Sequence, residues 1–484
     1  MVFSGLLFLI FFLTALILCY FPAGIISGKI KTEKAGRIGL GIQNGILLVF
    51  SLFFYAWGEP KCVFLLIFSS FVDYIDGILI ERFKDRPTAK KICLGISLSI
   101  NFSLLGIMKY TDFFIGTVNH IAGTAIPLSG IALPIGISFY TFQTTSYSID
   151  VYRGEVDAER NFFRYLTYIS MFSQLIAGPI VRYSHIKNEL TDRKTTLDNF
   201  TNGFRRFLIG LFRKVLIANE LGALWDYLRG VSNISVAGAW LGFLIFTLQL
   251  YYDFSAYSDM AIGLGLMMGF HFDENFRYPL SALSITDFWR RWHISLSGWF
   301  RDYVYIPLGG NRKGKARQLL NLVIVWFLTG LWHGAFWNYV LWGLYHGLML
   351  VLEKFIWGRF LEKTPKFFRH IYTLIIVIFG FGLFYFEDMS AFGTYLTYAF
   401  GLAGNAIAGP EILWAFGNYF PIIVFAVIFM FPVFPKITEY VKKLGEVKKN
   451  TVTFVAGLLS VGLLILCVAA LVRDSYNPFL YFRF

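Results

Sequence analysis

The chain has 484 residues, of which 56% are hydrophobic and only 15% are charged, and its formal net charge is +13. Soluble globular domains carry about 25% charged residues, so the composition excludes an ordinary soluble protein. The basic residues fall in short loops between apolar stretches, which indicates a surface facing the cytoplasm and its anionic lipids and argues against nucleic-acid binding.

Several stretches are apolar enough and long enough, at roughly 20 residues, to cross a bilayer as helices. They occupy residues 5–26, 92–108, 419–434 and 451–472, the last of which has 22 residues and no charge. We therefore predict an all-α polytopic membrane protein, with about 10 to 12 membrane-spanning helices and additional re-entrant or interfacial helices. The whole chain, residues 1–484, is expected to form a single integral-membrane domain.

Lysine and arginine residues cluster in alternate loops, whereas the segment between His370 and Pro435 contains none. By the positive-inside rule, the basic loops face the cytoplasm. This predicts that the N-terminus and the C-terminal tail, residues 473–484, lie on the extracytoplasmic side of the cytoplasmic membrane. The basic loops are residues 28–37, 81–91, 353–370 and 435–450.

Two phrases mix glycine, proline and polar residues within apolar surroundings. They are Pro134-Ile-Gly-Ile-Ser-Phe-Tyr-Thr-Phe-Gln143 and Gln174-Leu-Ile-Ala-Gly-Pro-Ile-Val-Arg182. Irregular backbone at membrane depth is tolerated where it is buried in protein or lines a cavity. We therefore predict broken or re-entrant helices at both places.

The phrase Gln249-Leu-Tyr-Tyr-Asp-Phe-Ser-Ala-Tyr-Ser-Asp-Met260 places Asp253 and Asp259 in an otherwise apolar stretch. Ser255 and Asp259 fall on one helical face with Tyr252. Carboxylates inside a membrane protein face a cavity or a charged partner. Two interpretations stay open: the residues line a substrate cavity, or they form a polar latch with an arginine of another helix.

Residues 287–303 have the pattern of an amphipathic helix at the cytoplasmic interface. Arg290 and Arg291 lie on the polar face. His293 lies on the apolar face, either as a packed residue of a membrane-surface anchor or as a residue of a site. The other members of the apolar face are Trp289, Trp292, Leu296, Trp299, Phe300 and Tyr303.

Residues 319–352 form a run of 34 uncharged residues. As one helix this run would be about 51 Å long, against a hydrocarbon core of about 30 Å, so it must fold back as a hairpin. The tip is expected at residues 334–338, just after Trp332 and His333. A neutral imidazole in apolar surroundings suits a general base. His346 either lines the same cavity or has a structural hydrogen-bonding role.

The C-terminal tail contains the aromatic phrase Tyr476-Asn-Pro-Phe-Leu-Tyr-Phe-Arg-Phe484. An interfacial aromatic belt accounts for it. The alternative is that the tail folds back towards the active cavity.

Five ordered phrases over about residues 130–350 resemble the membrane-bound O-acyltransferase family, in its alginate-acetylation branch. They are the two glycine-proline phrases and Tyr-Asp-Phe-Ser-Ala-Tyr-Ser-Asp, together with Phe-Trp-Arg-Arg-Trp-His-Ile-Ser-Leu-Ser and Leu-Trp-His-Gly-Ala. One departure is Leu383-Phe-Tyr-Phe-Glu387, because relatives often have an arginine after the paired aromatic residues.

The resemblance implies a ring of helices around a central tunnel, with His333 at its constriction and His293 as the second histidine of the site. A cousin that D-alanylates teichoic acid works with a separate peptide that has an aromatic end. The end of the present chain resembles that peptide fused in cis, which makes Tyr481 a candidate acyl relay.

The predicted activity is O-acyl transfer, most simply of an acetyl group from a cytoplasmic thioester, for O-acetylation of a cell-surface, alginate-like polysaccharide. The donor is acetyl-CoA or another acyl-CoA, or an acyl-carrier protein, and Arg290, Arg291, Arg312 and Lys313 would attract its phosphates. No bound cofactor and no metal are expected. The expected partners are membrane lipid and an extracytoplasmic SGNH-type acetyltransferase that passes the group to the polysaccharide. The alternatives are D-alanyl transfer to teichoic acid, and a proton-coupled transporter or flippase of a polar envelope precursor.

Overall fold

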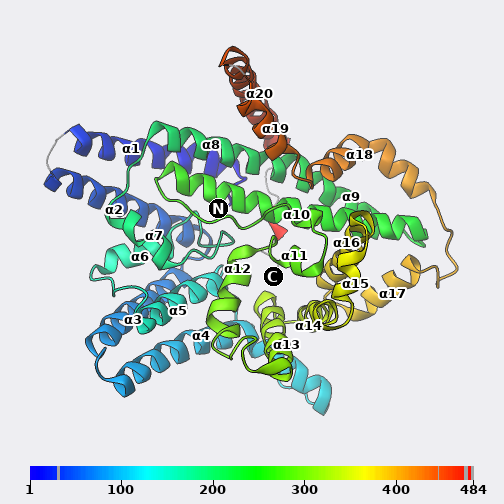
Figure 1. Ribbon diagram of the computed structural model, residues 1–484, viewed down its shortest axis with the longest axis horizontal. Coiled ribbons are helices and arrows are strands. Elements are labelled where there is room, and N and C mark those ends of the chain that lie inside the picture. The colour runs from blue at the N-terminus through cyan, green and yellow to red at the C-terminus, as the bar shows by residue number, and fades with distance from the viewer. Residues whose placement is uncertain (30–32, 445, 474–477, 481–484) are drawn as a thin grey trace. The chain divides into compact units, whose positions relative to one another are not determined.

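A computed structural model describes residues 1–484 except residues 30–32, 445, 474–477 and 481–484. Every regular element in the described part of the chain is a helix, which confirms the all-α prediction (Figure 1). The chain forms two compact units. The first comprises Met1–Phe207 and Ser258–Glu274, and the second comprises Leu208–Tyr257 and Asn275–Phe484. The expectation of a single membrane domain stays a prediction.

The first unit is built from pairs of neighbouring helices, of which α1 with α2 and α3 with α5 make the most extensive contacts. Its helices are α1 (Leu13–Lys29), α2 (Glu33–Gly58), α3 (Cys62–Arg82), α4 (Pro87–Ala122), α5 (Ile137–Arg153), α6 (Phe162–Ser170), α7 (Tyr183–Thr191) and the first part of α8 (Leu197–Phe212). A π-helical turn, Leu7–Phe12, precedes α1.

Both glycine-proline phrases contain the irregular backbone that the sequence predicts. The first turns at Gly136, which has φ of +78° and caps the start of α5. The second forms no helix between α6 and α7, and its residues 174–181 are buried. A Cβ atom at Gly136 would lie 2.8 Å from the carbonyl oxygen of Leu175, so glycine is required where the two segments meet.

The second unit contains the site discussed below. Its helices are α9 (Asn219–Arg229), the first part of α10 (Val236–Met267), α11 (Ile285–Trp289), α12 (Ile294–Phe300), α13 (Gly314–His333), α14 (Trp337–Leu352), α15 (Gly358–Lys363), α16 (Lys366–Tyr385), α17 (Met389–Ala399), α18 (Pro410–Phe429), α19 (Val433–Lys442) and α20 (Glu446–Arg473). Four shorter turns join them: Arg213–Ala218, Pro279–Ser281, Arg301–Tyr305 and Glu353–Trp357.

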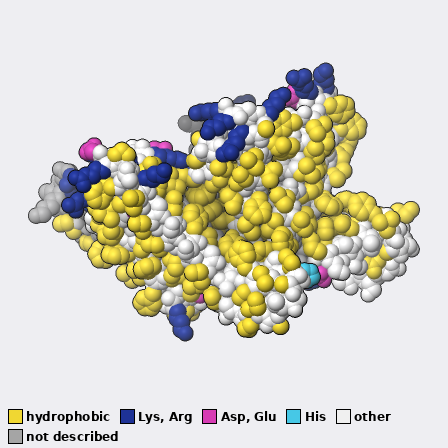
Figure 2. Space-filling view, turned by 90° about the horizontal axis from the view of Figure 1, so that it is seen from below, with side chains coloured by type: hydrophobic (Ala, Val, Ile, Leu, Met, Phe, Trp, Pro, Cys, Tyr) yellow, Lys and Arg dark blue, Asp and Glu magenta, His cyan; other side chains and the backbone are white. Residues whose placement is uncertain are grey.

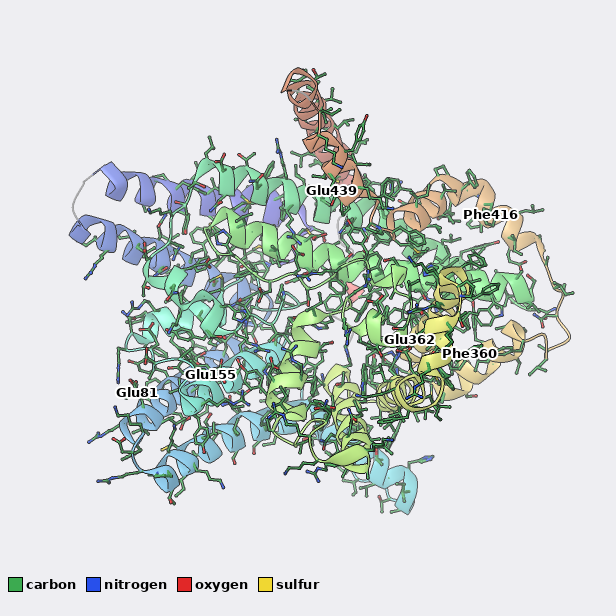
Figure 3. The ribbon with its side chains drawn as sticks, viewed as in Figure 1. Glu81, Glu155, Phe360, Glu362, Phe416 and Glu439 are labelled. Atoms are coloured by element: carbon green, nitrogen blue, oxygen red, sulfur yellow. The ribbon has the colours of Figure 1, made fainter. Side chains whose placement is uncertain are left out.

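Within the described residues, eight helices are long and apolar enough to cross a membrane. This supports the prediction of a multi-pass membrane protein. Exposed rings such as Phe360 on α15 and Phe416 on α18 are suited to a lipid environment (Figure 3). On the face drawn in Figure 2, hydrophobic side chains predominate and lysine and arginine occur in small groups. The candidate spans are Leu7–Gly24, Gly36–Gly58, Cys62–Arg82, Pro87–Ala122, Trp337–Lys363, Lys366–Tyr385, Pro410–Phe429 and Phe454–Arg473.

The uncharged run over residues 319–352 forms the predicted hairpin. Helix α13 ends at His333, residues 334–336 make the turn, and α14 begins at Trp337. These two helices pack against each other more extensively than any other pair of elements among the described residues.

The prediction of one amphipathic helix over residues 287–303 is wrong. The chain forms α11, breaks at residues 290–293, and resumes as α12 and the turn Arg301–Tyr305. His293 has φ of +43°, outside the helical region. The backbone N–H of Ile294 donates to the carbonyl of Asn275 (3.0 Å), and the N–H of Arg277 donates to the carbonyl of Arg291 (2.9 Å). These distant partners replace the helical hydrogen bonds. The predicted apolar face is nevertheless buried.

Candidate functional site

His333 is the last residue of α13 and its side chain lies in an aromatic environment. The residue is only 5% exposed. Its ring centroid lies 4.8 Å from that of Trp342 on α14, 5.3 Å from that of Phe384 on α16, and 5.0 Å from that of Trp332. Three helices therefore place the imidazole in apolar surroundings inside the second unit.

Trp332 connects His333 with the second histidine. The ring centroids of Trp332 and His293 are 5.9 Å apart, so the same indole contacts both imidazoles. The ring of His293 also packs edge-on against Phe254 of α10 at 4.9 Å. The structure thus brings together two histidines that are 40 positions apart in the sequence.

A hydrogen bond fixes the tautomer of His293. The side-chain oxygen of Asn275 accepts the backbone N–H (3.2 Å) and the hydroxyl (2.9 Å) of Ser295, and it also faces Nδ1 of His293 at 3.2 Å. A backbone N–H can only donate, so the atom facing it is the amide oxygen. Because that oxygen cannot donate, Nδ1 of His293 carries the proton. Nε2 is left as the nitrogen with the free lone pair, and it has no hydrogen-bond partner among the described residues.

The buried position of His293 keeps this imidazole neutral. The residue is 1% exposed and lies between the candidate spans, and burial lowers its pKa to about 3. Its geometry fits a neutral hydrogen-bond acceptor that positions another group.

His346 belongs to the same aromatic cluster but is sealed from solvent. Its ring lies 5.2 Å from that of Trp342, which also contacts His333, and 5.0 Å from that of Trp289. The residue is 0% exposed. A Cβ atom at Gly380 would lie 2.5 Å from its Nε2 atom, so α16 covers it closely. This packing favours the structural interpretation of His346.

Asp253 holds part of the C-terminal tail in place within the second unit. One of its oxygens pairs with Nζ of Lys214 at 2.6 Å, and the other accepts the backbone N–H of Leu480 at 2.7 Å. Nζ of Lys214 also donates to the carbonyl of Pro478 at 3.1 Å. The ring of Phe479 lies edge-on to Tyr257 at 4.8 Å and is 1% exposed. For residues 478–480, these contacts favour the alternative in which the tail folds back onto the protein over an interfacial aromatic belt.

The next tail residue, Tyr481, lies outside the described residues. The candidate relay therefore rests on its place in the sequence, directly after Leu480. Helix α10 connects the anchoring point with the histidines, because Phe254, which packs on His293, follows Asp253.

Asp259 forms a polar latch with an arginine of another helix, which is one of the two interpretations that the sequence left open. It accepts hydrogen bonds from Arg206 at 3.2 and 3.0 Å, and Arg206 also pairs with Glu274. Ser255 is buried and its hydroxyl faces the carbonyl of Tyr252 at 3.5 Å. These contacts favour the latch interpretation for Asp259.

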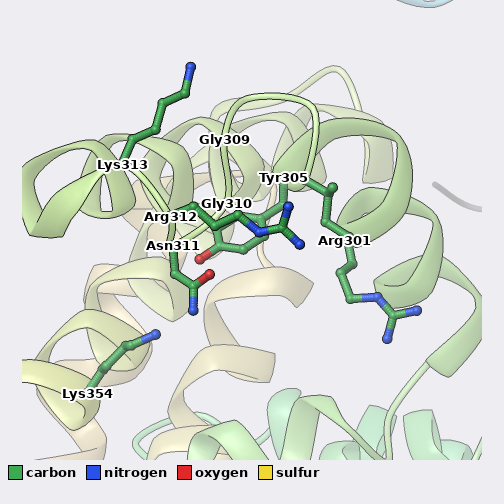
Figure 4. A pocket seen from close by; sticks show the side chains of 9 residues that line it. Arg301, Tyr305, Gly309, Gly310, Asn311, Arg312, Lys313 and Lys354 are labelled. Atoms are coloured by element: carbon green, nitrogen blue, oxygen red, sulfur yellow. The ribbon is translucent and has the colours of Figure 1, made fainter.

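A basic pocket of about 560 Å³ lies at the opposite end of α13 from His333 (Figure 4). Arg312 crosses the pocket beside Tyr305, whereas Lys313 projects away from it. The predicted donor residues Arg312 and Lys313 are thus found together, but Arg290 and Arg291 do not line this pocket; Arg291 instead pairs with Asp287 at 2.8 Å. The charged lining residues are Arg301, Arg312, Lys313 and Lys354.

Four residues of the site are missing from the sequence prediction: Asn275, Lys214, Phe384 and Trp342. Lys214 offered a signal, since it lies with Arg213 in an otherwise apolar stretch, where a buried cation needs a partner. Asn275 offered none, because its role depends on a backbone that turns out of the helical region at His293.

Comparisons with known proteins identify the family. Residues 157–396, which include both histidines and Asp253, match the membrane-bound O-acyltransferase family. The chain is 36% identical to a probable alginate O-acetylase of Pseudomonas putida over the full length of both chains. It is 37% identical to a peptidoglycan O-acetyltransferase of Helicobacter pylori over 66% of this chain and 65% of that one. It is 28% identical to a teichoic acid D-alanyltransferase of Bacillus subtilis over 52% of this chain and 68% of that one.

The helical fold and the eight candidate spans among the described residues define a multi-pass membrane protein. The chain belongs to the membrane-bound O-acyltransferase family and is an O-acyltransferase.

Proposed function

We propose that this protein transfers an acetyl group from a cytoplasmic thioester, acetyl-CoA, to a hydroxyl group that reaches it from outside, for O-acetylation of a cell-surface polysaccharide. His333 acts as the general base. His293 either orients the thioester or holds His333 in its working tautomer. The protein works in the cytoplasmic membrane, with its N-terminus and its tail on the extracytoplasmic side.

The observation that carries this proposal is the hairpin of α13 and α14. Its base lies at the basic pocket and its tip at His333. A helix of 20 residues is about 30 Å long, which is close to the thickness of the hydrocarbon core. Phosphates of a donor held by Arg312 and Lys354 would lie on the cytoplasmic side, while a long, flexible acyl arm extends along the hairpin towards His333.

The chemistry requires one proton acceptor and no external reagent. His333 takes the proton of the acceptor hydroxyl while its oxygen attacks the thioester carbonyl carbon. The carbon–sulfur bond then breaks, and the imidazolium returns the proton to the departing thiolate. An ester and a free thiol result. Positioned general-base catalysis contributes about 10²–10⁴-fold to such a step.

We assign the hydroxyl of Tyr481 as the candidate first acceptor. The contacts of Lys214 and Asp253 with residues 478–480 support this role, because they tie down the tail directly before Tyr481. An extracytoplasmic SGNH-type acetyltransferase would take the acetyl group from the tail to the polysaccharide. Replacing Tyr481 by Phe keeps the ring and removes the only atom that could carry the group.

The similarity to a teichoic acid D-alanyltransferase keeps D-alanyl transfer as a second candidate function. A proton-coupled transporter receives less support. Its relay would need Asp253 and Asp259, and both carboxylates are paired with cations of neighbouring segments.

The test uses purified protein in proteoliposomes with two labelled donors, acetyl-CoA and a D-alanyl carrier protein. We expect label from acetyl-CoA to appear on the protein's tail, detected by mass spectrometry of the C-terminal peptide, and to be absent in Tyr481→Phe. If only the D-alanyl donor labels the tail, the donor is a D-alanyl carrier protein and not acetyl-CoA. Equal labelling of the tail in Tyr481→Phe would exclude the relay.

A further inference from the structure

A second pocket in the same unit, of about 480 Å³, lies under the C-terminal tail. Pro478 and Leu480 form part of its wall, and Lys214, which anchors the tail, forms another part. Its size is within the range of small-molecule sites, which is about 300–1,000 Å³. Helices α9 and α10 supply most of the remaining lining, including Asn219, Gly222, Trp225 and Gln249.

Three buried polar atoms around this pocket have no hydrogen-bond partner among the described residues. They are the indole Nε1–H of Trp225 and the amide oxygens of Asn219 and Gln249. Trp225 is 2% exposed, so its N–H is withdrawn from bulk water. Buried polar atoms without partners are costly, and this set comprises one donor and two acceptors. A hydroxyl group both donates and accepts, so a ligand with several hydroxyl groups would satisfy all three.

The charges of the lining also favour a ligand rich in hydroxyl groups over a phosphate. Glu220 and Asp226 supply two negative charges, and Lys214 and Arg473 supply two positive charges. Glu220 pairs with Arg473 at 2.9 Å. In contrast, every charged residue of the basic pocket is a cation.

Residues that are neighbours in the sequence link this pocket with His333. Tyr385 lines the pocket, and the preceding residue, Phe384, packs on the ring of His333. On the other side, Lys214 of the lining pairs with Asp253, which precedes the Phe254 that packs on His293. The pocket therefore adjoins the surroundings of both histidines.

We infer that the pocket under the tail binds a sugar unit of the acetyl-accepting saccharide, with Trp225, Asn219 and Gln249 as its hydrogen-bonding residues. This inference rests on the proposed function, because it places the saccharide that finally receives the acetyl group next to the tail that carries it. The saccharide lies beside residues 478–480, where the extracytoplasmic transferase takes the acetyl group from the tail.

Binding is measured with the full chain in lipid nanodiscs and without an acyl donor, so that the result is independent of transfer. The probes are two radiolabelled trisaccharides, one of uronic acid and one of N-acetylglucosamine. We expect one of them to bind and Trp225→Phe, which removes the N–H but keeps a ring, to weaken its binding about fivefold, the usual effect of one hydrogen bond. In Gly222→Ala the new Cβ would lie 2.7 Å from Nε2 of Gln249, so this amide must turn and binding should weaken as well.

Trp240→Phe is the matched control, because its indole N–H donates to the carbonyl of Ala399 outside the pocket (2.9 Å). It should bind the probe as the wild type does. The inference is overturned if neither trisaccharide binds, or if Trp225→Phe and Gly222→Ala both bind with wild-type affinity. His333→Ala should keep binding while losing transfer, so failure of the proposed base and failure of the saccharide site give different results.

Discussion

At the scale of single residues, the two histidines have the same side chain but different surroundings. His333 ends a helix at the tip of a hairpin and is enclosed by rings from α13, α14 and α16. His293 donates through Nδ1 to Asn275 and has its pKa lowered to about 3 by burial. These differences assign proton transfer to His333 and positioning to His293 in our account.

Asn275→Asp tests the neutral state of His293. A carboxylate next to the imidazole favours the charged ring, so we expect the pKa of His293 to rise towards the neutral range. Transfer by the variant should then fall as the pH is lowered from 8 to 5, since an imidazolium has no free lone pair. The pH–rate profile of the wild type should show no titration of His293 between pH 8 and pH 5. The pH–rate profiles decide this, with Asn188→Asp at an exposed position of α7, outside the candidate spans, as the control. Identical profiles for Asn275→Asp and the control would contradict the assignment.

The same pKa has a consequence for stability. The pKa of His293 in the folded state lies below the ordinary value of 6.5, so the unfolded chain binds the proton first. The contribution of a neutral His293 is therefore complete above about pH 6.5 and is lost as the pH falls towards 3.

At the scale of elements, the hairpin depends on glycines that let α13 and α14 approach closely. A Cβ atom at Gly343 would overlap the carbonyl of Trp326, and one at Gly330 would overlap the carbonyl of Tyr339. These contacts bring Trp342 against His333. Side chains larger than hydrogen would separate the helices and displace this ring.

Gly343→Ala should therefore destabilise the protein by about 1–3 kcal/mol, the usual cost of overpacking. Gly417→Ala on α18 is the control, because nothing lies within 4 Å of its new Cβ atom. That change should be neutral or stabilise the helix by up to about 1 kcal/mol. Thermal unfolding in detergent measures both. Equal midpoints for the two variants would mean that the close packing of the hairpin is not required.

The tail anchor makes a separate prediction. Lys214 and Asp253 are 2% and 3% exposed, so removing one leaves a buried charge without its partner, at a cost of about 3–5 kcal/mol. Lys214→Met and Asp253→Leu should each lower the unfolding midpoint strongly. The double variant leaves no buried charge and should recover part of the loss. If the double variant shows the sum of the two single losses, the ion pair does not hold this region together.

The sequence predicted the elements better than it predicted their contacts. The length of the uncharged run over residues 319–352 was sufficient to require a hairpin with His333 near its tip. The 287–303 segment was mistaken for one helix, because periodicity records which side chains are buried and not the backbone partners at Asn275 and Arg277. Similarly, periodicity placed Asp253 and Asp259 in apolar surroundings but could not show that Lys214 and Arg206 are their partners.

The whole chain contains two chemically different pockets, both in its second unit. The basic pocket contains four cations, and the tail pocket has balanced charges. In the proposed mechanism the basic loops face the cytoplasm, so the donor would enter at Arg312 and Lys354 and the acceptor beside the tail. An activated ester and a hydroxyl group from opposite sides would then meet at the histidines.

Impermeant labelling tests this arrangement. A reporter cysteine in a cysteine-free background, placed at the C-terminus, should react from outside in intact cells. One placed at residue 362, in the basic loop, should react only after the membrane is opened. The opposite pattern would reverse the assigned sides and exclude the proposed direction of transfer.

The central claim is that His333 is the base that activates the acceptor. The most direct measurement is single-turnover acetyl transfer from labelled acetyl-CoA by His333→Ala in proteoliposomes, compared with His346→Ala from the same aromatic cluster. We predict a loss of about 10²–10⁴-fold for His333→Ala, with an unfolding midpoint close to that of the wild type, and a much smaller loss of transfer for His346→Ala. Transfer by folded His333→Ala at a rate near that of the wild type would contradict the account.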